Sequence, residues 1–291
     1  MILSKLNPLL TSIPFLFLYI LLIACSDDNS VNLISGEGVF ITASGEATIE
    51  GELFLPQGEG PFPVIIIVPG SGNDPRQDLE PFVDIILPNG YGVYLYDKRG
   101  IGASTGSYPT ETLEDPFPFL SARADDIIGI LELMATHVDV DESRITLFGS
   151  SQGTWVNCIA YSKQSTGVHS IVMASGGAVS TSVEAYYEEL IAMESTSIEA
   201  ANEMLADFSG DPGYDPVPTL NAMNIPVLFI YGGKDDSHPT LHDREIINSL
   251  NKPNFEIHFY PNANHELVDV DSNLFPSDLF SKLGIWLIAN K

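Results

Sequence analysis

The sequence predicts an α/β fold with a mostly parallel central sheet flanked by helices, and three observations support this. Residues 64–68 form a continuous apolar run, Val-Ile-Ile-Ile-Val, as expected for a strand buried on both faces of a parallel sheet. After that run, strand-like and helix-like segments alternate, which is the pattern of an open α/β sheet. Residues 145–153, Ile-Thr-Leu-Phe-Gly-Ser-Ser-Gln-Gly, carry an apolar strand directly into a serine bracketed by glycines. The 291 residues, of which 44% are apolar, suffice for one large domain or two small ones.

Each element follows from local pattern. Alternation and β-branched residues predict antiparallel strands over 39–44 and 47–55, with a turn at Gly45. Further strands are predicted at 64–68, 91–96, 144–148, 170–173, 227–231 and 255–260. Helical periodicity predicts helices at 80–87, 121–137, 152–161, 241–250 and 277–289. Ser121 is a favoured N-cap for the second of these helices.

Residues 178–224 interrupt this alternation. They contain no Lys or Arg, whereas they contain nine carboxylates: Glu184, Glu188, Glu189, Glu194, Glu199, Glu203, Asp207, Asp211 and Asp215. Ala201, Met204, Leu205 and Phe208 follow helical spacing, so at least one helix here has an apolar stripe to bury. The segment is predicted to be a small helical cap inserted after the sixth strand. The alternative is an ordinary pair of peripheral helices.

The N-terminus has a different composition. An apolar run from Leu9 to Ile23 follows a single Lys5 and ends in Ala24-Cys25, which is typical of an export signal and short for a membrane-spanning helix. The pattern resembles the lipobox of bacterial lipoproteins. That resemblance implies a signal peptide over 1–24, a lipid anchor on Cys25, a polar tether over 25–36 and a location in the cell envelope, on the outer membrane or cell surface. A plain N-terminal anchor helix is the alternative.

Charge and cysteine content restrict the partners. The net charge of −27 repels phosphate backbones, so no nucleic acid partner is expected. Cys158 lies in an apolar predicted helix and has no partner once Cys25 is acylated, so we expect an inert core thiol. Because the sequence has no zinc or redox spacing, no metal or organic cofactor is expected.

The glycine-bracketed serine has the form of a nucleophile elbow. A nucleophilic serine must stand on a sharp turn between strand and helix, and only small residues two positions before and after it let the backbones pass so closely. Gly149 and Gly153 occupy those positions, so the spacing favours Ser151 over Ser150. The helix that follows would aim backbone amides at an oxyanion, and the amide of Gln152 is the first predicted donor.

A serine nucleophile needs a base, and the base needs a third group to hold it in one tautomer. Two predicted strands after the elbow end in loops with suitable side chains. The first loop contains Asp235 and Asp236, and the second contains His265. The order serine, acid, histidine and the position of each residue past a strand end fit a triad-bearing fold.

Together with Val68-Pro-Gly-Ser-Gly72 and the motif Tyr96-Asp-Lys-Arg-Gly-Ile-Gly-Ala-Ser-Thr-Gly106, these features resemble the α/β-hydrolase superfamily, within its esterase-like and serine-aminopeptidase-like branch. The resemblance extends from about Gly51 to Lys291. It implies an α/β-hydrolase domain over 37–291 with a cap over about 178–224.

The resemblance also assigns roles. It implies that Ser151 is the nucleophile, that His265 is the general base and then acid, and that Asp235, rather than Asp236, orients the imidazole. It makes Ser71 the second oxyanion donor, although this chain has Pro69 where the family usually has a histidine. Two residues of the second motif are expected to be architectural and to pair with each other: Asp97 and Arg99. His238 is expected to be structural or solvated.

The function predicted from these residues is hydrolysis of a small carboxylic ester through an acyl-enzyme. An aminopeptidase of the same fold is an alternative, because carboxylates in the cap could hold a substrate's α-ammonium group. A surface binding protein that has lost turnover is another. The sequence leaves open the acyl chain and the leaving group, since the pocket shape is not encoded in composition.

Overall fold

The structure is a computed structural model that describes residues 34–35, 39–43, 47–109, 114–193 and 196–291. The predicted signal peptide, Cys25, most of the predicted tether and Gly45 lie outside the described residues. In the described part of the chain, no helix has both the length and the apolar character that crossing a membrane requires.

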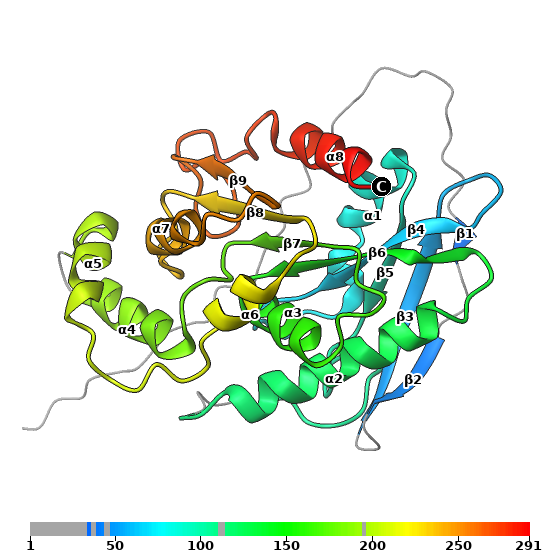
Figure 1. The fold of residues 1–291 in the computed structure, drawn as a ribbon, viewed down its shortest axis with the longest axis horizontal. Coiled ribbons are helices and arrows are strands. Elements are labelled where there is room, and N and C mark those ends of the chain that lie inside the picture. Colours follow the sequence, from blue (N-terminus) through cyan, green and yellow to red (C-terminus); the bar gives the residue numbers. More distant parts are fainter. Residues whose placement is uncertain (1–33, 36–38, 44–46, 110–113, 194–195) are drawn as a thin grey trace, which may run out of the picture. The chain divides into compact units, whose positions relative to one another are not determined.

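The sheet is mostly parallel, as predicted (Figure 1). Its strands are β1 (Ile34–Ser35), β2 (Val39–Ala43), β3 (Ala47–Leu55), β4 (Phe62–Val68), β5 (Gly92–Tyr96), β6 (Val140–Ser150), β7 (Ser170–Ala174), β8 (Val227–Gly232) and β9 (Phe255–Tyr260). Among the described residues these nine strands form one sheet in the order β1-β3-β5-β4-β6-β7-β8-β9, with β2 also paired to β3. The pairs made by β3 are antiparallel, and the pairs from β5 through β9 are parallel.

Helices connect the parallel strands, and a last helix, α8, follows β9. They are α1 (Pro81–Ile86), α2 (Phe117–Met134), α3 (Gln152–Lys163), α4 (Thr181–Ala192), α5 (Ile198–Met204), α6 (Val217–Ala222), α7 (Thr240–Leu250) and α8 (Leu279–Ala289). Among the residues that the structure describes, three short 3-10 turns also occur, at Arg76–Leu79, Leu87–Asn89 and Leu205–Asp207. The predicted helix at 121–137 begins four residues earlier, at Phe117. A proline lies in its first turn, a position that is compatible with a helix start. Ser121 therefore lies inside the helix and is not its N-cap.

Two apolar layers bury the sheet on both faces. Along β4, Val64, Ile66 and Val68 pack into one core with residues of α2, α3, α6 and α7. The alternate residues, Ile65 and Ile67, pack into a second core with residues of α1 and α8. Figure 1 shows α1 and α8 on one side of the sheet and α2 and α3 on the other. The continuous apolar run therefore reflects burial on both faces, as expected for a parallel strand.

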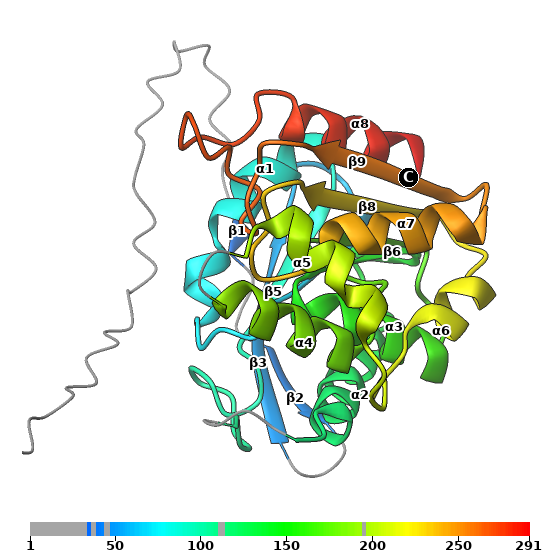
Figure 2. The ribbon, with the colours of Figure 1, turned by 90° about the vertical axis from the view of Figure 1, so that its left-hand side faces the viewer.

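The segment between β7 and β8 contains α4, α5 and α6. A small apolar cluster joins α4 to α5 and to the turn that follows, through Tyr187, Leu190, Ala201 and Leu205. The predicted stripe is only partly buried, because Met204 is 37% exposed. Figure 2 shows α4 and α5 in front of the strands, and the Tyr187 hydroxyl donates to the carbonyl of Asp235, just past the end of β8. The helices α4 and α5 therefore lie beside the loop that follows β8, at the carboxyl end of that strand.

Candidate active site

Ser151 lies in a strained turn between β6 and α3. Its φ is 52° and its ψ is −127°, a conformation that residues with a Cβ rarely adopt. A Cβ on Gly149 would lie 2.7 Å from the Gly153 carbonyl oxygen, and a Cβ on Gly153 would lie 2.3 Å from that of Val68. Both glycines are therefore required for the backbones to pass, which explains why a glycine occupies each position.

The turn is flanked by loops from both neighbouring strands. Val68 of β4 pairs with Gly149, and Ala174 of β7 pairs with Ser150. The loop after β4, residues 69–72, is called the oxyanion loop here. A Cβ on its Gly70 would lie 3.2 Å from the Ser151 Cβ and 3.7 Å from Oγ, so this loop runs directly past the serine.

His265 and Asp235 are brought together by the loops after β9 and β8. Nδ1 of His265 lies 2.9 Å from Oδ2 and 3.0 Å from Oδ1 of Asp235. Asp235 is 1% exposed, and its Oδ1 also accepts the backbone amides of Ser237 at 3.0 Å and His238 at 2.7 Å. The neighbouring Asp236 is exposed. The acid that contacts the imidazole is thus Asp235, held in one orientation by two backbone amides.

The pKa of His265 is raised above its usual 6.5. Burial lowers the pKa, but the hydrogen bond and the negative charge of Asp235 outweigh burial, and Glu266 adds a smaller effect in the same direction. An imidazole in this environment binds a proton more readily than a free one, which suits a base that takes a proton during the reaction.

The end of β7 holds the serine turn and the histidine loop to one rim of the sheet. The amide of Ser151 donates to the Ala174 carbonyl at 2.9 Å, and the Ser175 hydroxyl donates to the His265 carbonyl at 2.6 Å. Ser175 itself has a φ of 53°. Ser175 was not among the predicted site residues, although it lies directly before Gly176-Gly177 and just past a predicted strand, which was a usable signal.

The two predicted oxyanion donors belong to the two segments that border Ser151, the start of α3 and the oxyanion loop. Gln152 is the first residue of α3, so its amide is one of the unpaired donors at the start of the helix. Ser71 follows Gly70 in the oxyanion loop. The Arg123 guanidinium connects the two sides, since Nη1 donates to Gln152 Oε1 and Nη2 to the Pro69 carbonyl, each at 2.6 Å.

The predicted pairing of Asp97 with Arg99 is wrong, because each side chain binds a different residue. Asp97 accepts the amide of Arg76 at 2.7 Å and also binds its guanidinium. Arg99 donates from Nε and Nη2 to Asp126 at 2.8 and 2.7 Å. Both residues lie just past the end of β5, and each finds its partner on another element: Asp97 in the turn at Arg76–Leu79 and Arg99 on α2. Both side chains are buried and architectural.

His238 was expected to be structural or solvated, and the structure shows a buried ring that contacts two carboxylates. It is 1% exposed, and its ring nitrogens lie 2.6 Å from Glu184 of α4 and 3.0 Å from Asp243 of α7. Burial lowers its pKa, but the two carboxylates, Asp243 foremost, outweigh burial and raise the pKa well above 6.5. His238 therefore links the segment after β7 to the loop that carries Asp235.

No candidate metal site involves these residues. Within the described residues, no group of three or more His, Cys, Asp or Glu side chains is arranged to hold an ion. Cys158 is a buried free thiol whose pKa is raised by burial and, to a smaller extent, by Asp243. Such a thiol is a poor nucleophile, because only the thiolate reacts.

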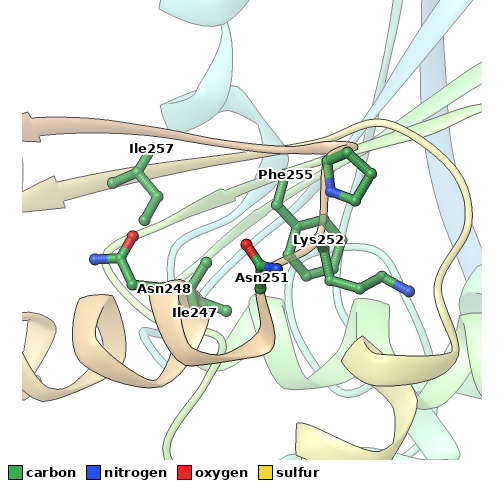
Figure 3. Close-up of a pocket in the computed structure, with 7 residues that line it drawn as sticks. Ile247, Asn248, Asn251, Lys252, Phe255 and Ile257 are labelled. Atoms are coloured by element: carbon green, nitrogen blue, oxygen red, sulfur yellow. The ribbon is translucent and has the colours of Figure 1, made fainter.

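Two hollows in the described part of the chain lie away from the predicted catalytic residues. One of about 500 Å³ lies between α7 and β9 and is lined by Ile247, Asn248, Asn251, Lys252, Pro253, Phe255 and Ile257 (Figure 3). Another of about 210 Å³ borders α4, α6 and α7, and Val183, Val217 and Ile246 are among the residues that line it. Neither is lined by Ser151, Asp235 or His265.

The sheet, its flanking helices and the elbow define an α/β-hydrolase. The sequence model of the prolyl oligopeptidase family matches residues 121–276, which is more than half of the chain. The chain therefore belongs to the prolyl oligopeptidase family and is a hydrolase of the α/β-hydrolase type.

Relatives and solved structures are consistent with this assignment. YfhR of Escherichia coli O157:H7 is 23% identical over 227 residues, covering 75% of this chain and 70% of that protein. The polyketide transferase af380 of Aspergillus fumigatus is 31% identical over 175 residues, covering 56% and 55%. The Pyrococcus furiosus esterase Pf2001 has a similar structure, with a TM-score of 0.65, 20% identity, and coverage of 88% of this chain and 91% of that one. At that identity the structural similarity concerns the fold.

Proposed function

We propose that this chain is a serine esterase that hydrolyses small carboxylic esters through an acyl-enzyme. Ser151 attacks the ester carbonyl and forms the acyl-enzyme as the alcohol leaves. His265 takes the serine proton and gives it to the leaving alcohol, and it then activates the water that releases the acid. Asp235 holds the imidazole in the required tautomer, and the amides of Gln152 and Ser71 stabilise the oxyanion.

The observation that carries this proposal is the contact between His265 Nδ1 and the buried carboxylate of Asp235, on the rim where the strained Ser151 turn also lies. A carboxylate that binds Nδ1 stabilises the tautomer in which Nε2 is free to accept a proton. The similarity to an esterase fold supports the choice of ester substrates.

The test compares a series of p-nitrophenyl acyl esters with aminoacyl p-nitroanilides, using the wild type and Ser151→Ala. We expect turnover of esters by the wild type and a loss of about 10⁴-fold in Ser151→Ala. Faster turnover of the anilide by the wild type would replace ester hydrolysis with amide hydrolysis. If neither substrate is cleaved and a fluorophosphonate leaves the protein unlabelled, the chain is a binding protein.

A second candidate is an aminopeptidase. The match to the prolyl oligopeptidase family favours it, and so does one residue of α4. Glu188 lies on α4, and its pKa is raised by burial and then by the charge of Glu184, while the charges of His238 and His265 oppose that rise. A carboxylate within electrostatic reach of the catalytic imidazole is suited to hold a substrate ammonium group. If so, Glu188→Gln raises KM for an aminoacyl anilide and leaves ester hydrolysis unchanged, and Glu189→Gln, at the neighbouring position, which is also exposed, alters neither.

For the location of the protein, we propose export as a lipoprotein anchored to the cell envelope through Cys25. The support is the apolar run that ends in Ala24-Cys25. Metabolic labelling with a palmitate analogue tests this: Cys25→Ser should abolish labelling, and Cys158→Ser, at the buried thiol, should retain it. Equal labelling of the two variants would exclude Cys25 as the anchor.

A further inference from the structure

The oxyanion loop is held through its carbonyl groups. Each of its four consecutive carbonyl oxygens accepts a hydrogen bond from a side chain on another element. The bonds run from Arg123 Nη2 to Pro69 O at 2.6 Å, from Lys98 Nζ to Gly70 O at 2.9 Å and to Gly72 O, and from Tyr108 Oη to Ser71 O. Three side chains thus fix a loop whose own sequence, with two glycines in four residues, is conformationally permissive.

One of these contacts bears directly on the second predicted oxyanion donor. The carbonyl of Gly70 and the amide N–H of Ser71 belong to the same peptide unit, which is planar and trans, so the two groups point in opposite directions. A side chain that holds the Gly70 carbonyl therefore also sets the direction of the Ser71 amide. Lys98 is that side chain.

Lys98 is itself held in place. It follows β5 between Asp97 and Arg99, which bind Arg76 and Asp126 respectively. It is 2% exposed, and its Nζ lies 4.9 Å from the centre of the Tyr108 ring. Burial, followed by the charge of Arg123, lowers its pKa to about 7, with Asp74 opposing. The two loop carbonyls replace the water that burial removed from this amine, as a buried polar group requires.

We propose that Lys98 is a positioning residue of the oxyanion site, which orients the Ser71 amide by binding the carbonyls of Gly70 and Gly72. Tyr108 and Arg123 hold the remaining two carbonyls of the loop. Lys98 acts through the loop and does not touch the substrate, and this role rests on the proposed serine hydrolase reaction at Ser151.

The test uses Lys98→Met, which keeps most of the apolar stem and removes the donors, and Lys98→Arg, which keeps a cation. Lys163→Met is the matched control, because Lys163 also donates to a backbone carbonyl, that of Ser121, but away from the oxyanion loop. Tyr108→Phe removes the hydroxyl that binds the Ser71 carbonyl of the loop. It serves as a milder variant should Lys98→Met fold poorly.

Three quantities are measured for each variant: kcat and KM on a p-nitrophenyl acyl ester, the inhibition constant of a matching trifluoromethyl ketone, and the hydrogen exchange of a peptide covering residues 69–72. The ketone forms an oxyanion on the serine, so its affinity reports the same site. For Lys98→Met we expect kcat to fall about 10- to 100-fold with KM nearly unchanged, and the inhibition constant to rise by the same factor as kcat falls.

Exchange in residues 69–72 should also become faster in Lys98→Met. Lys98→Arg should recover part of kcat, Tyr108→Phe should change all three quantities in the same direction by less, and Lys163→Met should match the wild type. The proposal is overturned if Lys98→Met keeps the wild-type kcat, or if kcat falls while the ketone binds as before. If the wild type cleaves no ester yet loop exchange rises only in the loop variants, the proposed function fails and the fixing of the loop by Lys98 stands.

Discussion

Nδ1 of His265 lies 2.9 Å from Oδ2 of Asp235, a carboxylate that is almost fully buried. This contact joins the ends of β8 and β9, so it forms only when the sheet is assembled. It also distinguishes Asp235 from its neighbour Asp236, which is exposed.

Asp235→Asn should lower kcat by about 10⁴-fold, because an amide stabilises the wrong tautomer of the imidazole and cannot balance its charge. The matched control is Asp236→Asn, which should leave kcat within about threefold of the wild type. Both variants are measured on the same p-nitrophenyl ester. A larger loss in Asp236→Asn than in Asp235→Asn would assign the orienting role to the other carboxylate.

The pH dependence of hydrolysis should show the raised pKa of His265. The base acts only when neutral, so a raised pKa means that activity is lost sooner as the pH falls, with a midpoint for kcat/KM above 6.5. Glu266→Gln removes a carboxylate that raises this pKa, so the midpoint should move to lower pH, by a small amount because Glu266 is exposed. A midpoint below 6.5 in the wild type would contradict the environment described for His265.

His238 should make the stability of the fold depend on pH. Its pKa in the folded protein lies well above 6.5, because Asp243 and Glu184 together outweigh burial. The charged ring therefore contributes its full stability below the unfolded-state pKa of about 6.5, and this contribution is lost as the pH rises through the higher folded-state pKa.

The corresponding variant is His238→Gln, which leaves the buried Asp243 without its cation. It should reduce the free energy of unfolding by about 3–5 kcal/mol near pH 6, and by less at alkaline pH. His242→Gln, at a half-buried histidine, should change it by less than about 0.5 kcal/mol. Denaturant unfolding over a pH series measures both, and a His238→Gln effect that grows with pH would refute the assignment of a charged ring.

The elements with a local signal could be predicted from the sequence. Val64–Val68 is apolar at every position because β4 is covered on both faces, and Gly149 and Gly153 are glycines because a Cβ at either would collide with backbone. The α/β-hydrolase fold follows from such patterns, and it is confirmed by the sheet and by the solved structures that share it.

The contacts that complete the site are not local, and the sequence could not reveal them. Lys98 binds carbonyls 26 and 28 residues earlier, and His238 binds a carboxylate 54 residues earlier. No spacing rule links such pairs, because they meet only where strands that are distant in sequence end side by side. The expected pairing of Asp97 with Arg99 was wrong for the same reason, since each of them pairs across the fold.

Fluorophosphonate labelling followed by mass spectrometry tests the central claim most directly, with Ser150→Ala as the matched control for Ser151→Ala. If Ser151 is the activated nucleophile, the adduct maps to Ser151 in the wild type and in Ser150→Ala, and no adduct forms in Ser151→Ala. An adduct on Ser150, or hydrolysis of the ester that survives in Ser151→Ala, would contradict the account.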